Sequence, residues 1–371
     1  MDFNVLQYAS DALITIVSGP HLIFLAIGVF VGLIVGMLPG LGGIAGMALI
    51  LPFIYGLDPG AALGMMVGMA AVTTTSDTFP SVLMGIPGSS GSQATVVDGF
   101  PMAKRGEAAR ALGAAFTASM FGGVFGAVVL TFALVAARPI LLSIGFAEQL
   151  MLVLFALTLV GMLTGPSMLK GLAACAIGLL IGAIGASTAT GELRMTFGMT
   201  YLIDGVPLIV VALGLFAIPE IIDVLRRHGS ISNESKLGRG LLDGVFDTLR
   251  HKWLVLRCAM IGSVLGALPG LGGTVIDWIA YGHVVQTTRG PNTFGRGDIR
   301  GVIAPESANN AKEGGALVPT LLLGIPGSGT MALLLGGLAV IGVTPGRSMV
   351  TTNIDLSYVM IWSIALANIL G

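Results

Sequence analysis

The stretch that decides the fold is GLIVGMLPGLGG at residues 32–43, an apolar run that ends in a proline and closely spaced glycines. A near copy, GSVLGALPGLGG, occupies residues 262–273 and agrees with it at eight of twelve positions. A second pair follows in the same order, LMGIPGS at 83–89 and LLGIPGS at 322–328, which agree at six of seven positions. Two different motifs that recur in one order predict an internal repeat.

The composition around these motifs is typical of a membrane protein. Hydrophobic residues make up 54% of the 371, charged residues only 10%, and the mean hydropathy is +0.94, whereas a soluble domain carries about 25% charged residues. The 56 glycines lie within apolar runs, which favours closely packed or broken transmembrane helices. We predict an all-α polytopic membrane protein with two homologous, inverted repeats and helices that are re-entrant or broken at proline and glycine.

The distribution of basic residues indicates the topology. All 18 lysines and arginines follow residue 103, and two basic loops, one around Lys104 and Arg105 and one in a polar linker, are expected in the cytoplasm. Because the two repeats then start on opposite faces of the membrane, they are expected to be inverted. The predicted segments are an interfacial helix at 1–19, transport repeat 1 at 20–110, scaffold transmembrane helices at 111–225, a cytoplasmic linker at 226–252, transport repeat 2 at 253–350 and the start of a further transmembrane helix at 351–371.

The broken helices indicate a transport site. Proline and glycine free backbone N–H and C=O groups, which are tolerated at membrane depth where they line a polar cavity. The N–H groups of a helix that starts after a break suit a carboxylate. The alternative is that each motif is a turn at the membrane surface. We predict one substrate site formed by Pro39, Gly40, Leu41, Gly42, Gly43, Gly85, Pro87, Gly88, Ser89, Ser90, Pro269, Gly270, Leu271, Gly272, Gly273, Ser307, Asn309, Asn310, Gly324, Pro326, Gly327, Ser328 and Thr330.

Ionisable and amide side chains near the breaks are candidates for binding a coupling cation, Na⁺ or H⁺, because such groups at membrane depth are usually functional. These candidates are Asp77, Glu306, Asn309 and Asn310. The two carboxylates would have no such role in a hydrated loop. Lys312 is expected to pair with its neighbour Glu313. The histidines and the two cysteines lack the spacing of metal ligands, so no cofactor and no metal beyond a possible Na⁺ is expected.

Six stretches of the chain resemble a known family. They are GMLPGLGG at 36–43, GIPGS at 85–89, DGFPMAKRGEAARALGAA at 98–115, ALPGLGG at 267–273, APESANNAKEGGALVPTLLLGIPGSGT at 304–330 and TPG at 344–346. In these stretches the chain resembles the large membrane subunit of tripartite tricarboxylate transporters, the TctA family. The resemblance implies a permease of the bacterial inner membrane that takes up a carboxylate by cation-coupled symport. It also implies two protein partners, a periplasmic solute-binding protein (TctC-like) and a small four-helix membrane subunit (TctB-like).

The sequence departs from this family at residues 73–80, where a glycine- and tyrosine-rich stretch is expected. Citrate, tartrate, other dicarboxylates and aromatic acids therefore all stay open as substrates. Members of the family are longer, so we expect this chain to be incomplete relative to them.

Other functions have less support from the sequence. The alternatives are an ion channel, a stand-alone organic-anion permease and an intramembrane enzyme. The sequence contains no HExxH motif and no GxSxG motif with a suitable histidine, so nothing of this kind supports an enzyme. The net charge of −1 gives no indication of a nucleic-acid partner. Saturable, gradient-dependent uptake separates a transporter from a channel.

Overall fold

The fold is almost wholly helical, which confirms the predicted all-α class. The computed structural model describes residues 5–145, 168–187, 191–207, 237–269, 271–289 and 293–371, and isolated positions between 147 and 155 and between 210 and 222. Within them, two short strands, β1 (Gly185–Ala186) and β2 (Leu193–Arg194), form an antiparallel pair. The helices are α1 (Val5–Ser18), α2 (His21–Met37), α3 (Gly42–Ile50), η1 (Leu51–Ile54), α4 (Pro59–Ser76), α5 (Thr78–Leu83), α6 (Gln93–Lys104), α7 (Ala108–Ser143), α9 (Met168–Gly182), η2 (Thr200–Leu202), α12 (Leu241–Arg250), α13 (Lys252–Gly266), α14 (Gly272–Thr287), α15 (Arg300–Leu323), α16 (Gly329–Val340), η4 (Arg347–Val350) and α17 (Ile354–Leu370).

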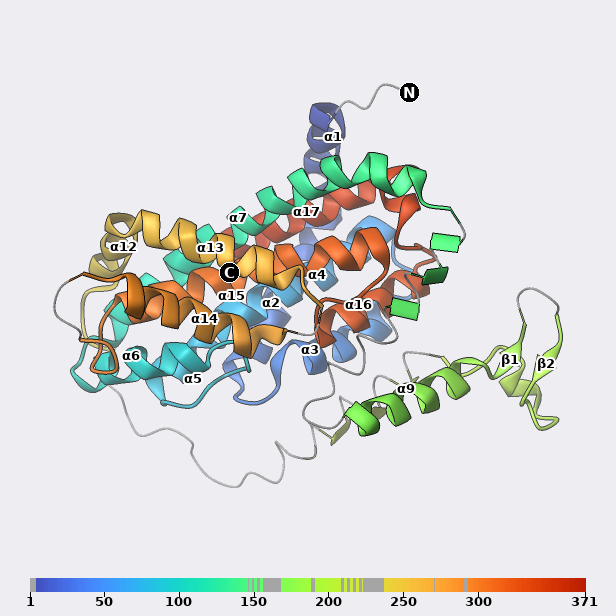
Figure 1. Cartoon of the computed structure of the whole chain (residues 1–371), viewed down its shortest axis with the longest axis horizontal. Helices are drawn as coiled ribbons and strands as arrows, with labels where there is room; N and C mark the ends of the chain where they lie inside the picture. Colours follow the sequence, from blue (N-terminus) through green and yellow to red (C-terminus); the bar gives the residue numbers. More distant parts are fainter. Residues whose placement is uncertain are drawn as a thin grey trace.

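Helix α15 lies inside the helical bundle (Figure 1). It packs against α7, α13, α14 and α6, and its residues are buried almost continuously from Gly301 to Leu322. Helix α9 and the β1–β2 pair project away from this bundle (Figure 1). A helix that is buried all round has no solvent-facing stripe, so its polar residues must find partners inside the protein.

One helix of the described residues, α7, is long and apolar enough to cross a membrane, and the α1–α2 pair, bent by 77°, also passes if it counts as one span. Residues 111–137, the start of the expected scaffold segment at 111–225, lie inside α7. The N-terminal helix expected over residues 1–19 occupies Val5–Ser18. Residues 156–167 and 223–225 of the expected scaffold segment at 111–225, and residues 226–236 of the linker, lie outside the described residues.

The two halves present their helices in the same order. In the first half α2 is followed by the proline-glycine break, α3, α4, the second break, α6 and α7; in the second half the order is α13, break, α14, α15, break, α16 and α17. The halves differ in one helix. The first-half counterpart of α15 is divided at Asp77 into α4 and α5, whereas α15 continues through Pro305 and Pro319.

Glycines allow equivalent helices of the two halves to approach closely. A Cβ atom added at Gly36 of α2 would lie 2.5 Å from the carbonyl oxygen of Thr73 on α4. One added at Gly266 of α13 would lie 2.5 Å from the carbonyl oxygen of Lys312 on α15. The two glycines are 230 residues apart and their partners 239 apart, which are the offsets between the repeated motifs. The α2–α4 and α13–α15 contacts are therefore counterparts.

Candidate functional site

The glycine-proline breaks of both halves meet at one cavity with a volume of about 680 Å³. It is lined by Gly40, Leu41, Gly42, Gly43, Ile44, Ala70, Thr73, Thr74, Pro87, Gly88, Ser89, Ser90, Gly91, Gln93, Gly273, Lys312, Glu313, Ser328, Gly329 and Thr330. Small residues dominate this lining, so backbone groups are accessible to a ligand. A cavity of this size fits a small organic molecule, since ligand pockets measure about 300–1,000 Å³.

Four helices begin at the wall of this cavity. Helix α3 starts at Gly42, α6 at Gln93 and α16 at Gly329, and all three residues line it. Helix α14 starts at Gly272, next to the lining residue Gly273. The first N–H groups of a helix lack partners within the helix and form the positive end of its dipole. Four such ends around one cavity favour an anion.

The two Gly-Ile-Pro-Gly-Ser breaks have the same backbone arrangement. The first glycine of each motif adopts a left-handed φ, of 70° at Gly85 and 69° at Gly324. The hydroxyl of Ser81 accepts a hydrogen bond from the Gly88 N–H at 3.4 Å. At the second break a threonine hydroxyl accepts the equivalent bond from the Gly327 N–H at 3.3 Å. The repeated sequence thus produces repeated local structure.

The halves also contact each other through equivalent positions. A Cβ atom added at Gly43 would lie 2.7 Å from Thr330 Oγ1, and one added at Gly273 would lie 3.2 Å from Gly91 Cα. Positions 43 and 273 are 230 residues apart, and positions 91 and 330 are 239 apart. Each half therefore offers the start of its first broken helix to the second break of the other half. Reciprocal contacts of this kind are characteristic of a two-fold relation.

Lys312 and Glu313 carry the charges among the described residues that line the cavity. The Lys312 Nζ atom lies 2.7 Å from Glu313 Oε1, and the two side chains are only 11% and 10% exposed. The second carboxylate oxygen of Glu313, Oε2, is buried without a hydrogen-bond partner. Three further buried carboxyl groups interact electrostatically with Lys312: Asp77, Asp277 and Glu306. Acidic groups thus outnumber this lysine four to one.

The predicted cation-binding residues lie around the same region, and none of them lines the cavity. Asp77 accepts a hydrogen bond from the hydroxyl of Ser89, and its Oδ1 has no partner. Glu306 accepts hydrogen bonds from Thr95 at 2.6 Å and Ser119 at 3.0 Å. The carboxylates are therefore buried inside the protein, which contradicts the alternative of a hydrated loop.

The two asparagines connect α15 to the first half. Asn309 donates a hydrogen bond to the Thr74 carbonyl at 3.2 Å, and Asn310 donates to Thr75 Oγ1 at 2.7 Å. Asn310 also donates to Asn368 on α17 at 2.7 Å. The side-chain oxygens of both Asn309 and Asn310 are buried without partners. Both residues thus hold helices together and keep an acceptor available.

The chain matches a known protein family. The model of the tripartite tricarboxylate transporter TctA family matches residues 22–371. The chain belongs to this family. A relative from Agrobacterium vitis, described as an uncharacterized 52.8 kDa protein in the TAR-I ttuC' 3' region, is 32% identical over 356 residues, covering 96% of this chain and 71% of the relative. A second A. vitis protein, from the TAR-II ttuC' 3' region, is 39% identical over 109 residues, covering 29% of this chain and 45% of that protein.

No solved structure matches the chain. Membership of the TctA family identifies the protein as a subunit of a membrane transporter rather than as an enzyme. The earlier resemblance is therefore confirmed. Within the described residues of this TctA protein, no group of three or more His, Cys, Asp or Glu side chains is placed to hold a metal ion.

Some residues of the predicted substrate site line the cavity of this TctA protein, and others do not. The predicted residues that line it are Gly40, Leu41, Gly42, Gly43, Pro87, Gly88, Ser89, Ser90, Gly273, Ser328 and Thr330. The described predicted residues outside the lining are Pro39, Gly85, Pro269, Leu271, Ser307, Asn309, Asn310, Gly324, Pro326 and Gly327. Gly272 is described only as the first residue of α14. Gly270 lies outside the described residues.

Sequence reasoning missed the place of Lys312 and Glu313. Their mutual pairing was predicted and is confirmed, but both also line the cavity, together with Thr73, Thr74 and Gln93. The sequence does contain an indication of this position. Lys312 and Glu313 lie in a helix that has no polar face, and a charged pair in such a helix needs polar surroundings inside the protein.

The role of the TctA stretch at 98–115 was also missed. Asp98 Oδ1 accepts hydrogen bonds from the backbone N–H groups of Gly297 and Asp298, each at 2.8 Å, and Tyr281 donates to Asp98 Oδ2 at 2.9 Å. The Arg105 guanidinium donates to the Gly297 carbonyl at 2.7 Å. These contacts hold the loop that precedes α15 against the first half. They thereby help to position α15, which carries Lys312.

The two basic loops of this protein lie together. Arg110 Nε is 2.7 Å from Asp247 Oδ2 on α12, and the Ala109 N–H donates to the Leu237 carbonyl at 2.8 Å. The contact agrees with the expectation that both loops lie on one side of the membrane.

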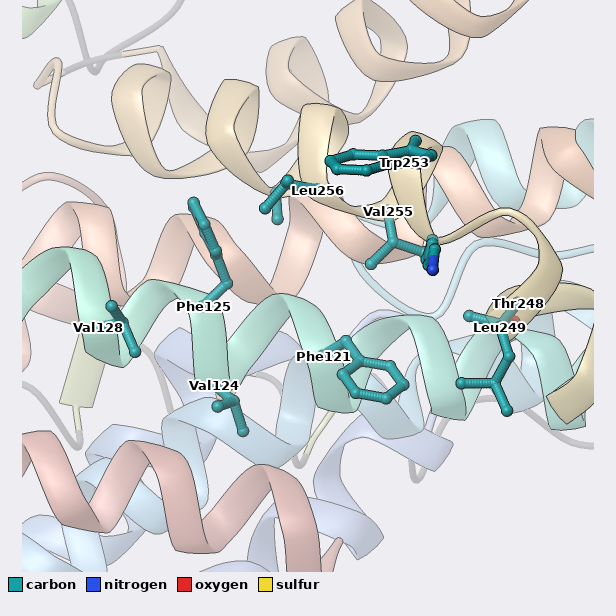
Figure 2. A pocket seen from close by; sticks show the side chains of 11 residues that line it. Phe121, Val124, Phe125, Val128, Thr248, Leu249, Trp253, Val255 and Leu256 are labelled. Atoms are coloured by element: carbon teal, nitrogen blue, oxygen red, sulfur yellow. The ribbon is translucent and has the colours of Figure 1, made fainter.

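A second hollow of the TctA protein is a groove of about 570 Å³ beside α7, α12 and α13. Figure 2 shows Phe121 and Phe125 of α7 and Trp253 and Leu256 of α13 along it. Lys252 is the charged residue among its described lining residues. This apolar lining offers a carboxylate few polar partners, so the cavity between the breaks is the better candidate site.

Proposed function

We propose that this protein is the large permease subunit of a tripartite secondary transporter, which imports a tricarboxylate or related carboxylate with a coupling cation. The observation that carries the proposal is the convergence of four helix N-termini on a cavity lined by both halves. A multiply charged carboxylate gains from every such end, because each is the positive end of a helix dipole. The family membership supports the transport class.

The buried charges support cation coupling. Among the described residues around the cavity, four acidic groups, Asp77, Asp277, Glu306 and Glu313, surround the one cation Lys312. Bringing an anion into such surroundings is costly unless positive charge enters with it, because unpaired buried charges are strongly unfavourable. We therefore propose symport with Na⁺ or H⁺, with Asp77, Glu306, Asn309 and Asn310 as cation-coupling candidates.

The reciprocal contacts between the halves support an inverted repeat. We propose that a pseudo-two-fold axis relates the repeats, which would place one substrate site between them as in other transporters with broken helices. The protein would then be multi-pass in the bacterial inner membrane. The tripartite family supports the two proposed protein partners, a periplasmic solute-binding protein and a small membrane subunit.

Uptake into proteoliposomes tests the function. All three subunits are reconstituted, and citrate, malate, tartrate and an aromatic acid are supplied with a Na⁺ or a pH gradient, each varied alone. We expect saturable uptake of one of these acids that requires the binding protein and one gradient. Uptake that is linear in concentration and independent of either gradient would indicate a channel. Saturable uptake that is unchanged without the binding protein would support a stand-alone permease.

A glycine substitution tests the site. Leucine at Gly43 would place a side chain against Thr330, where even a Cβ atom lies at 2.7 Å, and would occupy the cavity. Gly43→Leu is therefore expected to abolish uptake. The matched control is Gly282→Leu on α14, where an added Cβ atom has no heavy atom within 4 Å. Equal uptake by the two variants would contradict the site.

A further inference from the structure

The position of Lys312 is unfavourable unless an anion lies beside it. Its Cε atom lies 3.0 Å from a Cβ atom added at Gly273, so the side chain lies at the start of α14. A positive charge at a helix N-terminus is repelled by the helix dipole. In this structure Glu313 supplies the compensating anion, with Nζ and Oε1 2.7 Å apart.

The pair breaks the symmetry of the cavity. By the offset of 239 residues, the first-half counterparts of Lys312 and Glu313 are Thr73 and Thr74. All four residues line the cavity, and the packing of Gly36 against Thr73 repeats that of Gly266 against Lys312. The two walls thus have equivalent backbones, and among the described lining residues those with charge, Lys312 and Glu313, lie on the second-half wall. A carboxylate therefore can form an ion pair with a lysine on the second-half wall.

The contacts of Glu313 allow it to exchange its partner Lys312 for another cation. Its Oε1 holds Lys312, while its Oε2 is buried without any hydrogen-bond partner. The hydrogen bond from Lys312 Nζ to Glu313 Oε1, at 2.7 Å, joins the two neighbouring residues of α15. A buried carboxylate with an unpartnered oxygen gains from any cation that reaches it.

We propose that Lys312 binds a carboxylate of the transported substrate, and that Glu313 is its exchangeable partner, which releases Lys312 to the substrate and takes up the coupling cation instead. This inference rests on the proposed transport function. The exchange balances: one ion pair and two incoming ions of opposite charge become two ion pairs. It requires one cation for each substrate carboxylate that Lys312 receives.

Three other ionisable groups face this pair. They are Asp77 at the junction of α4 and α5, Asp277 on α14 and Glu306 on α15. Asp277 accepts a hydrogen bond from the Ala94 N–H at 2.8 Å, and Glu306 accepts two from hydroxyl groups. Asp77 and Asp277 each also keep one oxygen, Oδ1, buried without a hydrogen-bond partner. Glu313 differs from these acids because its partner, Lys312, is a cation that lines the cavity.

The test uses the reconstituted three-subunit transporter. Its probes are the acid from the citrate, malate and tartrate panel that the wild type takes up best, and the monoamide of that acid. Lys312→Met is expected to raise the KM for the acid roughly 10- to 150-fold, the range of a lost charged hydrogen bond. The wild type should discriminate against the monoamide by a similar factor. Lys312→Met should not discriminate between the acid and its monoamide. The substitution and the amide each remove the same ion pair, so their effects on KM are not additive.

The exchange itself is tested with Glu313→Gln. This variant frees Lys312 in advance, so the KM should fall and the dependence of uptake on the Na⁺ or pH gradient should weaken. The arm in which wild-type uptake responds, Na⁺ or pH, identifies the cation. The control Lys252→Met removes an exposed lysine from the apolar groove and should change neither value.

Several outcomes would overturn the inference. A KM of Lys312→Met within twofold of wild type, or an unchanged preference for the acid over its monoamide, would exclude Lys312 as the carboxylate-binding residue. Unchanged gradient dependence in Glu313→Gln would exclude the exchange. If Lys312→Met does not accumulate, the double variant Lys312→Met/Glu313→Gln, which buries no unpaired charge, carries the same test. Wild-type complex that takes up none of the acids would instead contradict the proposed function.

Discussion

Helix α13 approaches α15 so closely that a single methyl group should displace the backbone at Lys312. In Gly266→Ala the new Cβ atom would lie 2.5 Å from the Lys312 carbonyl oxygen and 2.9 Å from its Cα atom. Ordinary contacts begin at 3.4 Å, so the two helices must separate by about 0.9 Å. Overpacking of this kind costs about 1–3 kcal/mol. We expect a lower melting temperature and a higher KM, because the Lys312 side chain moves with its backbone.

The matched control for this variant is Gly282→Ala on α14, where the added Cβ atom meets no heavy atom within 4 Å. It carries the same gain in helix propensity, about 1 kcal/mol, without the overlap. Thermal unfolding in detergent and uptake kinetics are measured for both. Gly36→Ala, whose Cβ atom would lie 2.5 Å from the Thr73 carbonyl oxygen, should destabilise the first half similarly. If Gly266→Ala were as stable and active as Gly282→Ala, the close-contact reasoning would be wrong.

Two further predictions concern the loops. Burial raises the pKa of Asp298, but hydrogen bonds from Arg300 and Thr293 outweigh it and lower the pKa to about 2. This carboxylate therefore stabilises the fold at neutral pH, by roughly 2 kcal/mol, and the contribution is lost as the pH falls from about 4 towards 2. Asp298→Asn should lower the melting temperature at pH 7, and its difference from wild type should narrow below pH 4; a constant difference would contradict the assignment. Single cysteines at Arg105 and Arg239 should stay unlabelled by an impermeant thiol reagent in intact cells and react in inverted vesicles, because both basic loops are expected in the cytoplasm; ready labelling in intact cells would reverse the topology.

The features that could best be predicted from the sequence are the helix breaks at the repeated proline-glycine motifs. Proline combined with glycine, at residues 39–43 and 324–327, ends regular helix for a local reason, so the breaks between α2 and α3 and between α15 and α16 follow from sequence. Pro305 and Pro319 lack such adjacent glycines and remain inside α15. Glycine at 85 and 324 is required by the left-handed φ there, which is again local. Such features need no knowledge of the rest of the fold.

Contacts between distant segments could not be predicted in this way. Asp98 belongs to a conspicuous stretch, but its partners Gly297 and Asp298 lie about 200 residues away. Similarly, α15 is buried on every side, so helical periodicity could not tell that Lys312 and Glu313 point to the cavity while Asn310 points to α17. A uniform pattern of burial carries no information about direction.

The buried polar residues of α15 have a consequence for how the protein is made. At 24 residues α15 is long enough to span a bilayer, yet it is not among the described helices that are apolar enough to do so. Each of Glu306, Lys312 and Glu313 would add about 2.5–3.5 kcal/mol to insertion near the centre of an isolated helix. During synthesis, α15 therefore cannot insert into the lipid bilayer as an independent transmembrane helix. It can enter the membrane only when α7 and α13 surround it, so insertion of the second half depends on α7, a helix that precedes that half in the sequence.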